Sequence, residues 1–130
     1  ATQPRDLNEM DGVFGDGSVY SSASDLALWD GALRNGTLIP LEIIQQAYEP
    51  ITLNSGRLSN YGFGWFVNPN DNSVEHAGGW QGFSSYIFRD LTNEGLIVVL
   101  DNSSNAIRVP AFGFLFNSIS KNLKKAMVAN

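Results

Sequence analysis

Apolar residues in the first half of the chain recur at the spacing of an amphipathic helix. The residues that show this helical spacing are Leu26, Leu28, Trp29 and Leu33. Ser22, with Asp25 three residues later, is similar to a capping box, and Asn35-Gly36 supplies a stop signal. The pattern therefore predicts a helix over about 23–34.

A second, shorter helix is predicted directly after the first. Pro40 suits the first turn of a helix, because the N–H that proline lacks has no partner there. The helix is expected to run from Leu41 to about Tyr48, and Pro50 ends it. The polar stretch 54–60 is then expected to be a loop.

The second half of the chain carries the patterns of β-strands. Aromatic, β-branched and alternating residues predict four strands, over 61–67, 73–76, 83–89 and 96–100. Turn-forming residues separate the first two strands at 68–72 and the last two at 92–95. The run 96–100 is apolar throughout, which is typical of a strand covered on both faces.

The two ends of the chain differ in pattern. Residues 1–14 hold little periodicity and are predicted to be a loop-like segment. A final helix is predicted from Pro110, with an apolar stripe of Phe112, Leu115, Phe116, Ile119 and Leu123. Two helices, about four antiparallel strands and a last helix predict an α+β fold, an antiparallel sheet with flanking helices.

Composition narrows the class of protein without changing this picture. The 130 residues suit about one domain, and 43% hydrophobic content is enough to form a core. Thirteen acidic against eight basic residues give a net charge of −5. Nucleic-acid binding needs a basic face, and the sequence shows no such patch, so binding to nucleic acid is not expected. The basic cluster Lys121, Lys124 and Lys125 suits the C-terminal end of a helix.

Several kinds of site and segment are excluded or not expected. The chain contains no cysteine, which excludes disulfides, a thiolate nucleophile and a cysteine-based zinc site. With a single histidine, a His-rich metal site is not expected either, and we expect no cofactor. No apolar run approaches the roughly 20 residues that cross a bilayer. The start at Ala1 has neither an initiator methionine nor the pattern of a signal peptide. We therefore expect a mature form or a piece of a longer chain.

The densest chemical feature is His76-Ala77-Gly78-Gly79-Trp80-Gln81-Gly82-Phe83. Its glycines let the backbone approach a ligand closely, and the histidine lies beside them at a predicted strand end. The same residues have a purely structural interpretation: a β-hairpin whose glycines form a bulge, with a histidine on the surface. Trp65 and Trp80 are also interpretable as core aromatics, which is the interpretation we favour for Trp65.

This segment resembles the third signature motif of the serine β-lactamase and penicillin-binding-protein superfamily. The motif is Lys-Thr-Gly in many members and His-x-Gly in class C-like esterases and peptidases, as in His76-Ala77-Gly78. Three other segments are similar to the family in order and spacing: Gly15 to Ala27, Tyr61-Gly62-Phe63-Gly64-Trp65, and Leu96 to Asn102. The resemblance covers nearly the whole chain from Gly15 onward. It implies that residues 1–130 are a single partial domain, the C-terminal portion of a β-lactamase/transpeptidase-like fold.

The resemblance also implies roles for individual residues. In the family the residue after His-x-Gly gives a backbone N–H to the oxyanion hole, and here it is Gly79. His76 would be a second catalytic group, near the substrate carboxylate or carbonyl and near the family's catalytic Tyr, where it would polarise the substrate or share a proton. Ala77, Gly78 and Trp80 would bind substrate, since a side chain at Gly78 would block it. Trp80 departs from the small residue frequent in true lactamases, which favours an apolar acyl group or a closed pocket and counts against penicillin hydrolysis.

The nucleophile of the family is missing from this chain. In the family it belongs to a Ser-x-x-Lys motif followed by Tyr-x-Asn or Ser-x-Asn, and neither motif precedes residue 15. Ser118-Ile119-Ser120-Lys121 and Ser103-Ser104-Asn105 spell such motifs, but both follow His76 and so stand in the wrong order. We expect neither to be functional, because patterns this short arise by chance.

Two functions of different classes remain open from the sequence. The first is a C-terminal fragment of a serine hydrolase that cleaves an amide, ester or β-lactam through an acyl-serine intermediate. The fragment alone is then expected to be inactive, to need the missing N-terminal part as its partner, and otherwise to self-associate. Its expected location is the bacterial periplasm or outside the cell. The second is a non-catalytic module that stacks peptidoglycan or other glycans on Trp80, Tyr61 and Trp65, and an incidental α+β domain is the remaining alternative.

Overall fold

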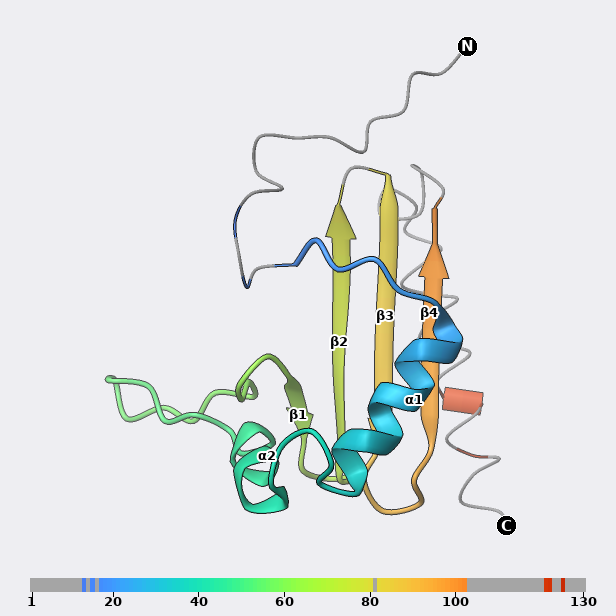
Figure 1. Cartoon of the computed structure of the whole chain (residues 1–130). Coiled ribbons are helices and arrows are strands. Elements are labelled where there is room, and N and C mark those ends of the chain that lie inside the picture. Colours follow the sequence, from blue (N-terminus) through green and yellow to red (C-terminus); the bar gives the residue numbers. More distant parts are fainter. Residues whose placement is uncertain are drawn as a thin grey trace.

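The computed structural model describes residues 13, 15, 17–80, 82–102, 121, 122 and 125. Two helices come first, α1 (Ala23–Arg34) and α2 (Leu41–Ala47). Four strands follow: β1 (Phe66–Asn68), β2 (Ser73–Trp80), β3 (Phe83–Asp90) and β4 (Leu96–Asp101) (Figure 1). The predicted α+β class is confirmed.

The four strands form one antiparallel sheet in the order β1-β2-β3-β4. β2 and β3 pair along their whole length, from Ser73 with Asp90 to Trp80 with Phe83. The Asp90 carboxylate closes the turn into β4, because it accepts hydrogen bonds from the backbone N–H groups of Thr92 and Asn93 at 2.8 and 2.9 Å. Burial raises the pKa of Asp90, but these hydrogen bonds outweigh it, so the pKa lies below its ordinary value and the carboxylate stays charged.

The first helix begins and ends where the sequence signals lie. Ser22 is its N-cap, and the Ser22 hydroxyl accepts a hydrogen bond from the backbone N–H of Asp25 at 3.1 Å. Asn35 caps the other end, and Gly36 follows with a positive φ of 72°. The expected helix over 23–34 is thereby confirmed with its boundaries.

Two strand predictions differ from the structure. The strand expected over 61–67 is present only as β1, because Gly62 and Gly64 bend the chain before it. A Cβ on Gly62 would lie 2.1 Å from the carbonyl oxygen of Ala47, and Gly64 has a φ of +79°. The strand expected over 73–76 instead continues to Trp80, since pairing with β3 holds the glycine-rich segment extended.

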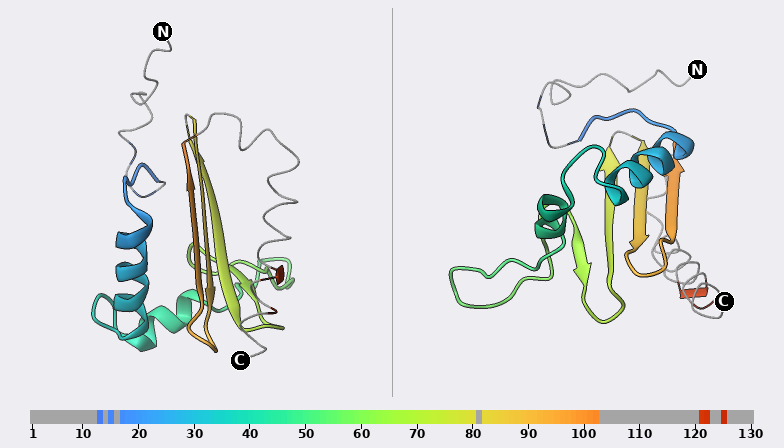
Figure 2. Two further views of the ribbon diagram at one scale, coloured as in Figure 1. Left: turned by 90° about the vertical axis from the view of Figure 1, so that its right-hand side faces the viewer. Right: turned by 60° about the horizontal axis from the view of Figure 1, so that its bottom comes forward.

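The core lies between the sheet and the helices, with α1 on one face of the sheet (Figure 2). Its buried members are Leu33, Ile44, Ala47, Trp65, Val67 and Val74. Trp65 stacks on Trp29 with ring centroids 6.3 Å apart, which confirms Trp65 as a core aromatic. A glycan-stacking surface that includes Trp65 was therefore a wrong prediction.

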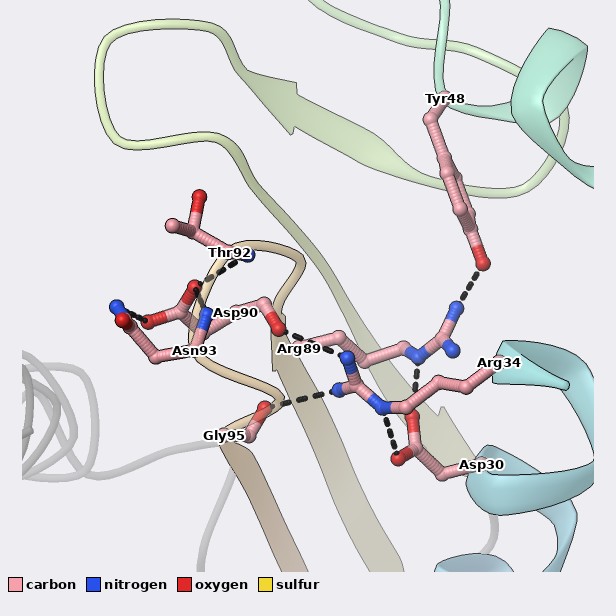
Figure 3. A network of polar contacts seen from close by, with 8 residues as sticks. All are labelled: Asp30, Arg34, Tyr48, Arg89, Asp90, Thr92, Asn93 and Gly95. Carbon is pink, nitrogen blue, oxygen red and sulfur yellow. Dashed lines mark hydrogen bonds and ion pairs between the residues drawn. The ribbon is translucent and has the colours of Figure 1, made fainter.

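A buried polar network fastens α1 to the sheet (Figure 3). The Arg89 side chain on β3 is 1% exposed and forms an ion pair with Asp30 of α1. It also donates a hydrogen bond to the Tyr48 hydroxyl and lies 5.5 Å from the centre of the Trp65 ring. Burial lowers the pKa of Arg89, and the Asp30 carboxylate opposes that shift.

The strand expected to be covered on both faces, β4, is only partly buried in the part of the chain that the structure describes. In β4 the residues 96–99 are half-buried, and Leu100 is 43% exposed. On α1, Leu28 is 74% exposed although it follows the apolar period of the helix. Cover on both faces stays a prediction for the full domain, because an apolar run reports what a strand can bury and not what covers it.

Some expectations fall outside the described residues. They are the loop-like segment 1–14 (apart from Val13), the Ser-x-Asn at 103–105, and the start and apolar stripe of the helix from Pro110. Lys121, Asn122 and Lys125 are helical, in agreement with a helix in this region.

Candidate active site

The predicted site residues lie in a row along one edge of β2. β1 pairs only with Ser73, Val74 and Glu75. No other described strand lies alongside that edge where β2 continues through 76–79 (Figure 1). His76 is half-buried, while the residues from Ala77 to Trp80 are exposed. The structure thus brings all five predicted residues, His76, Ala77, Gly78, Gly79 and Trp80, onto one accessible strand.

His76 is held in place by two aromatic side chains. Its Nε2 atom lies 2.8 Å from the hydroxyl oxygen of Tyr61, within hydrogen-bonding distance. Its ring stacks on Phe66, with centroids 5.8 Å apart and planes 22° apart. Tyr61 in turn packs edge-on against Phe66 at 4.8 Å. The three rings form a cluster, which we call the His76 cluster, where β1 meets the open edge of β2.

Sequence reasoning missed the roles of Tyr61 and Phe66 in this cluster. Tyr61 is the first residue of the Tyr-Gly-x-Gly-Trp segment. Because the sequence pattern predicts a strand for that segment, it does not predict a contact between Tyr61 and His76. The segment is a turn, and Tyr61 forms an isolated bridge to Phe66 instead of a strand. The signal that could have revealed it is an aromatic residue before two glycines, because such a turn can bring a ring back over the next strand.

Gly78 and Gly79 on β2 lie opposite different residues of β3. A Cβ on Gly78 would lie 2.5 Å from the Ser85 hydroxyl oxygen, so the hydroxyl occupies the space of a side chain there. Gly79 lies opposite Ser84, one pair before the end of the β2–β3 ladder. Two residues separate the last pair, Trp80 and Phe83, and such a short connection closes on a hydrogen-bonded pair. By the alternation of an antiparallel ladder, the N–H of Gly79 then points away from β3, toward the open edge.

Trp80 lies at the far end of β2, beyond the glycines. It is 39% exposed and pairs in register with Phe83, which also packs edge-on against Tyr20 at 6.3 Å. Gly82, in the connection between the two strands, has a φ of +98°. The end of the hairpin is therefore an exposed aromatic surface next to Gly79.

No group of three or more His, Asp or Glu side chains within the described part of the chain could hold a metal ion. In the same residues, none of the helices has both the length and the apolar character to cross a membrane.

Comparison with known proteins decides the family. A family model described as Beta-lactamase matches residues 1–113 of this chain. The chain belongs to the β-lactamase family. The match begins at residue 1, so it extends the resemblance into the segment before Gly15. The expected family and the β-lactamase-like α+β fold are thereby confirmed, as is the coarser view of a serine hydrolase-like fragment.

A curated relative agrees with this assignment. The chain is 35% identical over 96 residues to "Penicillin-binding protein 4*" of Bacillus subtilis (strain 168). The aligned part is 72% of this chain and 21% of that protein. The chain thus spans about a fifth of the length of the relative that it matches.

Proposed function

We propose that this chain supplies one wall of the active site of a hydrolase that acts through an acyl-serine intermediate. The observation that carries the proposal is the open edge of β2, where His76 and the N–H of Gly79 lie on the same strand. In such a hydrolase, a serine attacks the carbonyl carbon of an amide, an ester or a β-lactam, and water later releases the acyl group. The substrate would lie along the edge of β2 that no described strand covers.

Gly79 would contribute to the oxyanion hole. A backbone N–H that points away from the sheet can donate to the oxygen that becomes negative in the transition state. Loss of one such donor costs about 10²–10³ in rate in other enzymes. The second donor would be the N–H of the nucleophilic serine, which we place in sequence preceding residue 1.

Gly78, Ala77 and Trp80 would contact the substrate beside this hole. A side chain at Gly78 would collide with the Ser85 hydroxyl, which is a structural reason for the glycine. The substrate would also need the space that such a side chain would fill. The exposed ring of Trp80 would pack on an apolar part of the acyl group. This arrangement favours an ester or peptide substrate over penicillin.

Replacing His76 with alanine in the full-length protein is expected to lower kcat/KM at least tenfold, about 1.4 kcal/mol. His76 is half-buried and is not part of the core, so the protein is expected to remain folded. Steady-state kinetics with an ester substrate measure the effect, and circular dichroism measures the fold.

Glu94→Gln is the matched control for this variant. Glu94 is exposed in the turn that joins β3 to β4, next to the end of β2 that lies away from Gly79. The control is expected to keep the wild-type kcat/KM. If His76→Ala also kept it, His76 would be a surface residue without a catalytic role.

The missing N-terminal part of the domain would be the partner of this chain. Several large apolar side chains are exposed on α1 and α2, including Leu28, Trp29, Leu41 and Ile43. Such a surface marks a missing partner, and the outer edge of β4, which pairs with no described strand on that side, invites pairing with another chain. We therefore place the N-terminal part against these helices and against the sheet.

The isolated chain is expected to self-associate through this surface. Light scattering after size-exclusion chromatography is expected to give a mass above 14.2 kDa, and addition of the N-terminal part is expected to reduce it to a one-to-one complex. A stable monomer at high concentration without a partner would show that the chain has a sufficient core of its own.

We propose that the protein is located in the bacterial periplasm or outside the cell. This location is supported by the similarity to a bacterial penicillin-binding protein. Fractionation of the producing cells tests it.

A further inference from the structure

We infer that Tyr61 is a positioning residue that fixes the proton of His76 on Nδ1. The contact that carries the inference is the 2.8 Å distance between the Tyr61 hydroxyl oxygen and Nε2 of His76. The two residues are 15 positions apart, on a turn and on β2. The consequence for catalysis rests on the proposed function, whereas the position of the proton does not.

Tyr61 is fixed by its own backbone independently of any ligand. The N–H of Tyr61 donates to the Ser59 hydroxyl at 3.0 Å, and its carbonyl accepts from the N–H of Ile51 at 3.1 Å. The next residue, Gly62, donates to the Trp65 carbonyl at 2.8 Å and fits closely against the Ala47 carbonyl. The backbone of Tyr61 is therefore fixed, and the edge contact of its ring with Phe66 places its hydroxyl beside Nε2 of His76.

The chemistry of the pair decides which group donates. A neutral imidazole has one N–H donor and one acceptor nitrogen, and a phenol can donate or accept. A phenol is more acidic than the N–H of a neutral imidazole, and the unprotonated imidazole nitrogen is the stronger acceptor of the two. Tyr61 therefore donates to Nε2, and the proton of neutral His76 lies on Nδ1.

Phe66 restricts the rotation of the His76 imidazole ring. The Phe66 ring is stacked on His76 and is also in edge contact with Tyr61. A half-turn of the imidazole about its Cβ–Cγ bond would put a ring carbon, Cε1, where Nε2 now lies and would break the hydrogen bond to Tyr61. The ring is thus held in one orientation and one tautomer before substrate arrives.

This assignment gives His76 a specific role in the proposed hydrolase. Nδ1–H is a hydrogen-bond donor without a positive charge, so it can bind a carbonyl or carboxylate oxygen of the substrate while the imidazole is neutral. A His76 that carried its proton on Nε2 would present an acceptor at Nδ1, which would repel such an oxygen. Tyr61 would therefore affect catalysis only through His76.

The tautomer can be measured directly, because His76 is the single histidine of the chain. A long-range ¹H–¹⁵N spectrum of the ¹⁵N-labelled chain, at a pH well above the ordinary histidine range, distinguishes a protonated from an unprotonated ring nitrogen. We expect protonated Nδ1 and unprotonated Nε2. The opposite pattern in the wild type would overturn the inference without any variant.

Tyr61→Phe removes the hydroxyl and keeps the ring that packs on Phe66. In this variant the tautomer is expected to shift to protonated Nε2, which free neutral imidazole side chains prefer. Tyr20→Phe is the matched control, because it makes the same chemical change at a tyrosine that is 74% exposed, and it is expected to leave the spectrum of His76 unchanged. An unchanged tautomer in Tyr61→Phe would overturn the inference.

Kinetics in the full-length protein test the consequence separately. Tyr61→Phe is expected to lower kcat/KM severalfold, by less than His76→Ala, and to have no further effect when His76 is already alanine. An additional loss in the double variant would overturn the claim that Tyr61 acts through His76. If the full-length protein formed no acyl-serine while the chain showed protonated Nδ1, the proposed function would fail and the tautomer assignment would stand.

Discussion

Purified without any other part of the protein, the chain is expected to leave a chromogenic cephalosporin and a p-nitrophenyl ester unhydrolysed. The family's Ser-x-x-Lys and Tyr-x-Asn motifs, which activate the nucleophile, do not precede residue 15. In the proposed site His76 and the N–H of Gly79 would stabilise a reacting carbonyl, but neither group could attack it. Loss of a serine nucleophile costs about a millionfold in kcat in a well-studied protease. Absorbance assays at high protein concentration detect any remaining turnover.

The informative contrary result would be turnover that depends on a serine of this chain. Ser118 begins the misplaced Ser-x-x-Lys, so Ser118→Ala is the variant that tests it. Hydrolysis by the wild-type chain that disappeared in Ser118→Ala would establish a nucleophile here and contradict the proposed division of the site. Ser21→Ala serves as the control, because Ser21 is an exposed serine before α1.

Replacing Asp30 with alanine is expected to cost about 3–5 kcal/mol of stability, because it leaves a buried guanidinium without its carboxylate. The Arg89 side chain is 1% exposed and that of Asp30 is 7% exposed. Asp30 also binds Arg34, whose remaining guanidinium nitrogens donate to the backbone carbonyls of Asp90 and Gly95 (Figure 3). Since domains are stable by only about 5–15 kcal/mol, this loss would remove a large share of the free energy of unfolding. Urea unfolding monitored by circular dichroism measures it.

Two further variants keep this prediction decisive. Asp25→Ala makes the same change in the first turn of the same helix, where the side chain is exposed, and is expected to cost about 1 kcal/mol or less. Asp30→Leu combined with Arg89→Met removes the buried charges together and is expected to be more stable than Asp30→Ala. Equal losses in Asp30→Ala and Asp25→Ala would show that the network contributes little to stability.

The sequence predicted those parts of the fold that are determined by nearby residues. The helix over 23–34 is bounded by Ser22 and by Asn35-Gly36, so its ends follow from local capping. The positions of β3 and β4 follow from runs of strand-forming residues and from the turn between them. The row from His76 to Trp80 was found from its glycines and its motif, and the structure places it on the accessible second half of β2.

Contacts between distant segments were not predictable in this way. The length of β1 depends on how Gly62 fits against Ala47, and the length of β2 depends on its pairing with β3. The contact between Tyr61 and His76 requires both of these features. The ion pair between Asp30 and Arg89 joins residues 59 positions apart, and nothing in the local pattern of α1 marks Asp30 as buried.

The position of the acylated serine is the most direct test of the proposed division of the active site. The full-length protein is incubated with a slowly hydrolysed acylating β-lactam and with an ester probe, digested, and analysed by mass spectrometry. We expect one acyl group, on a serine that precedes Ala1, and a lower rate of its formation when His76 is alanine. An acyl group on a serine within residues 1–130, or no acyl group with either probe, would contradict the account.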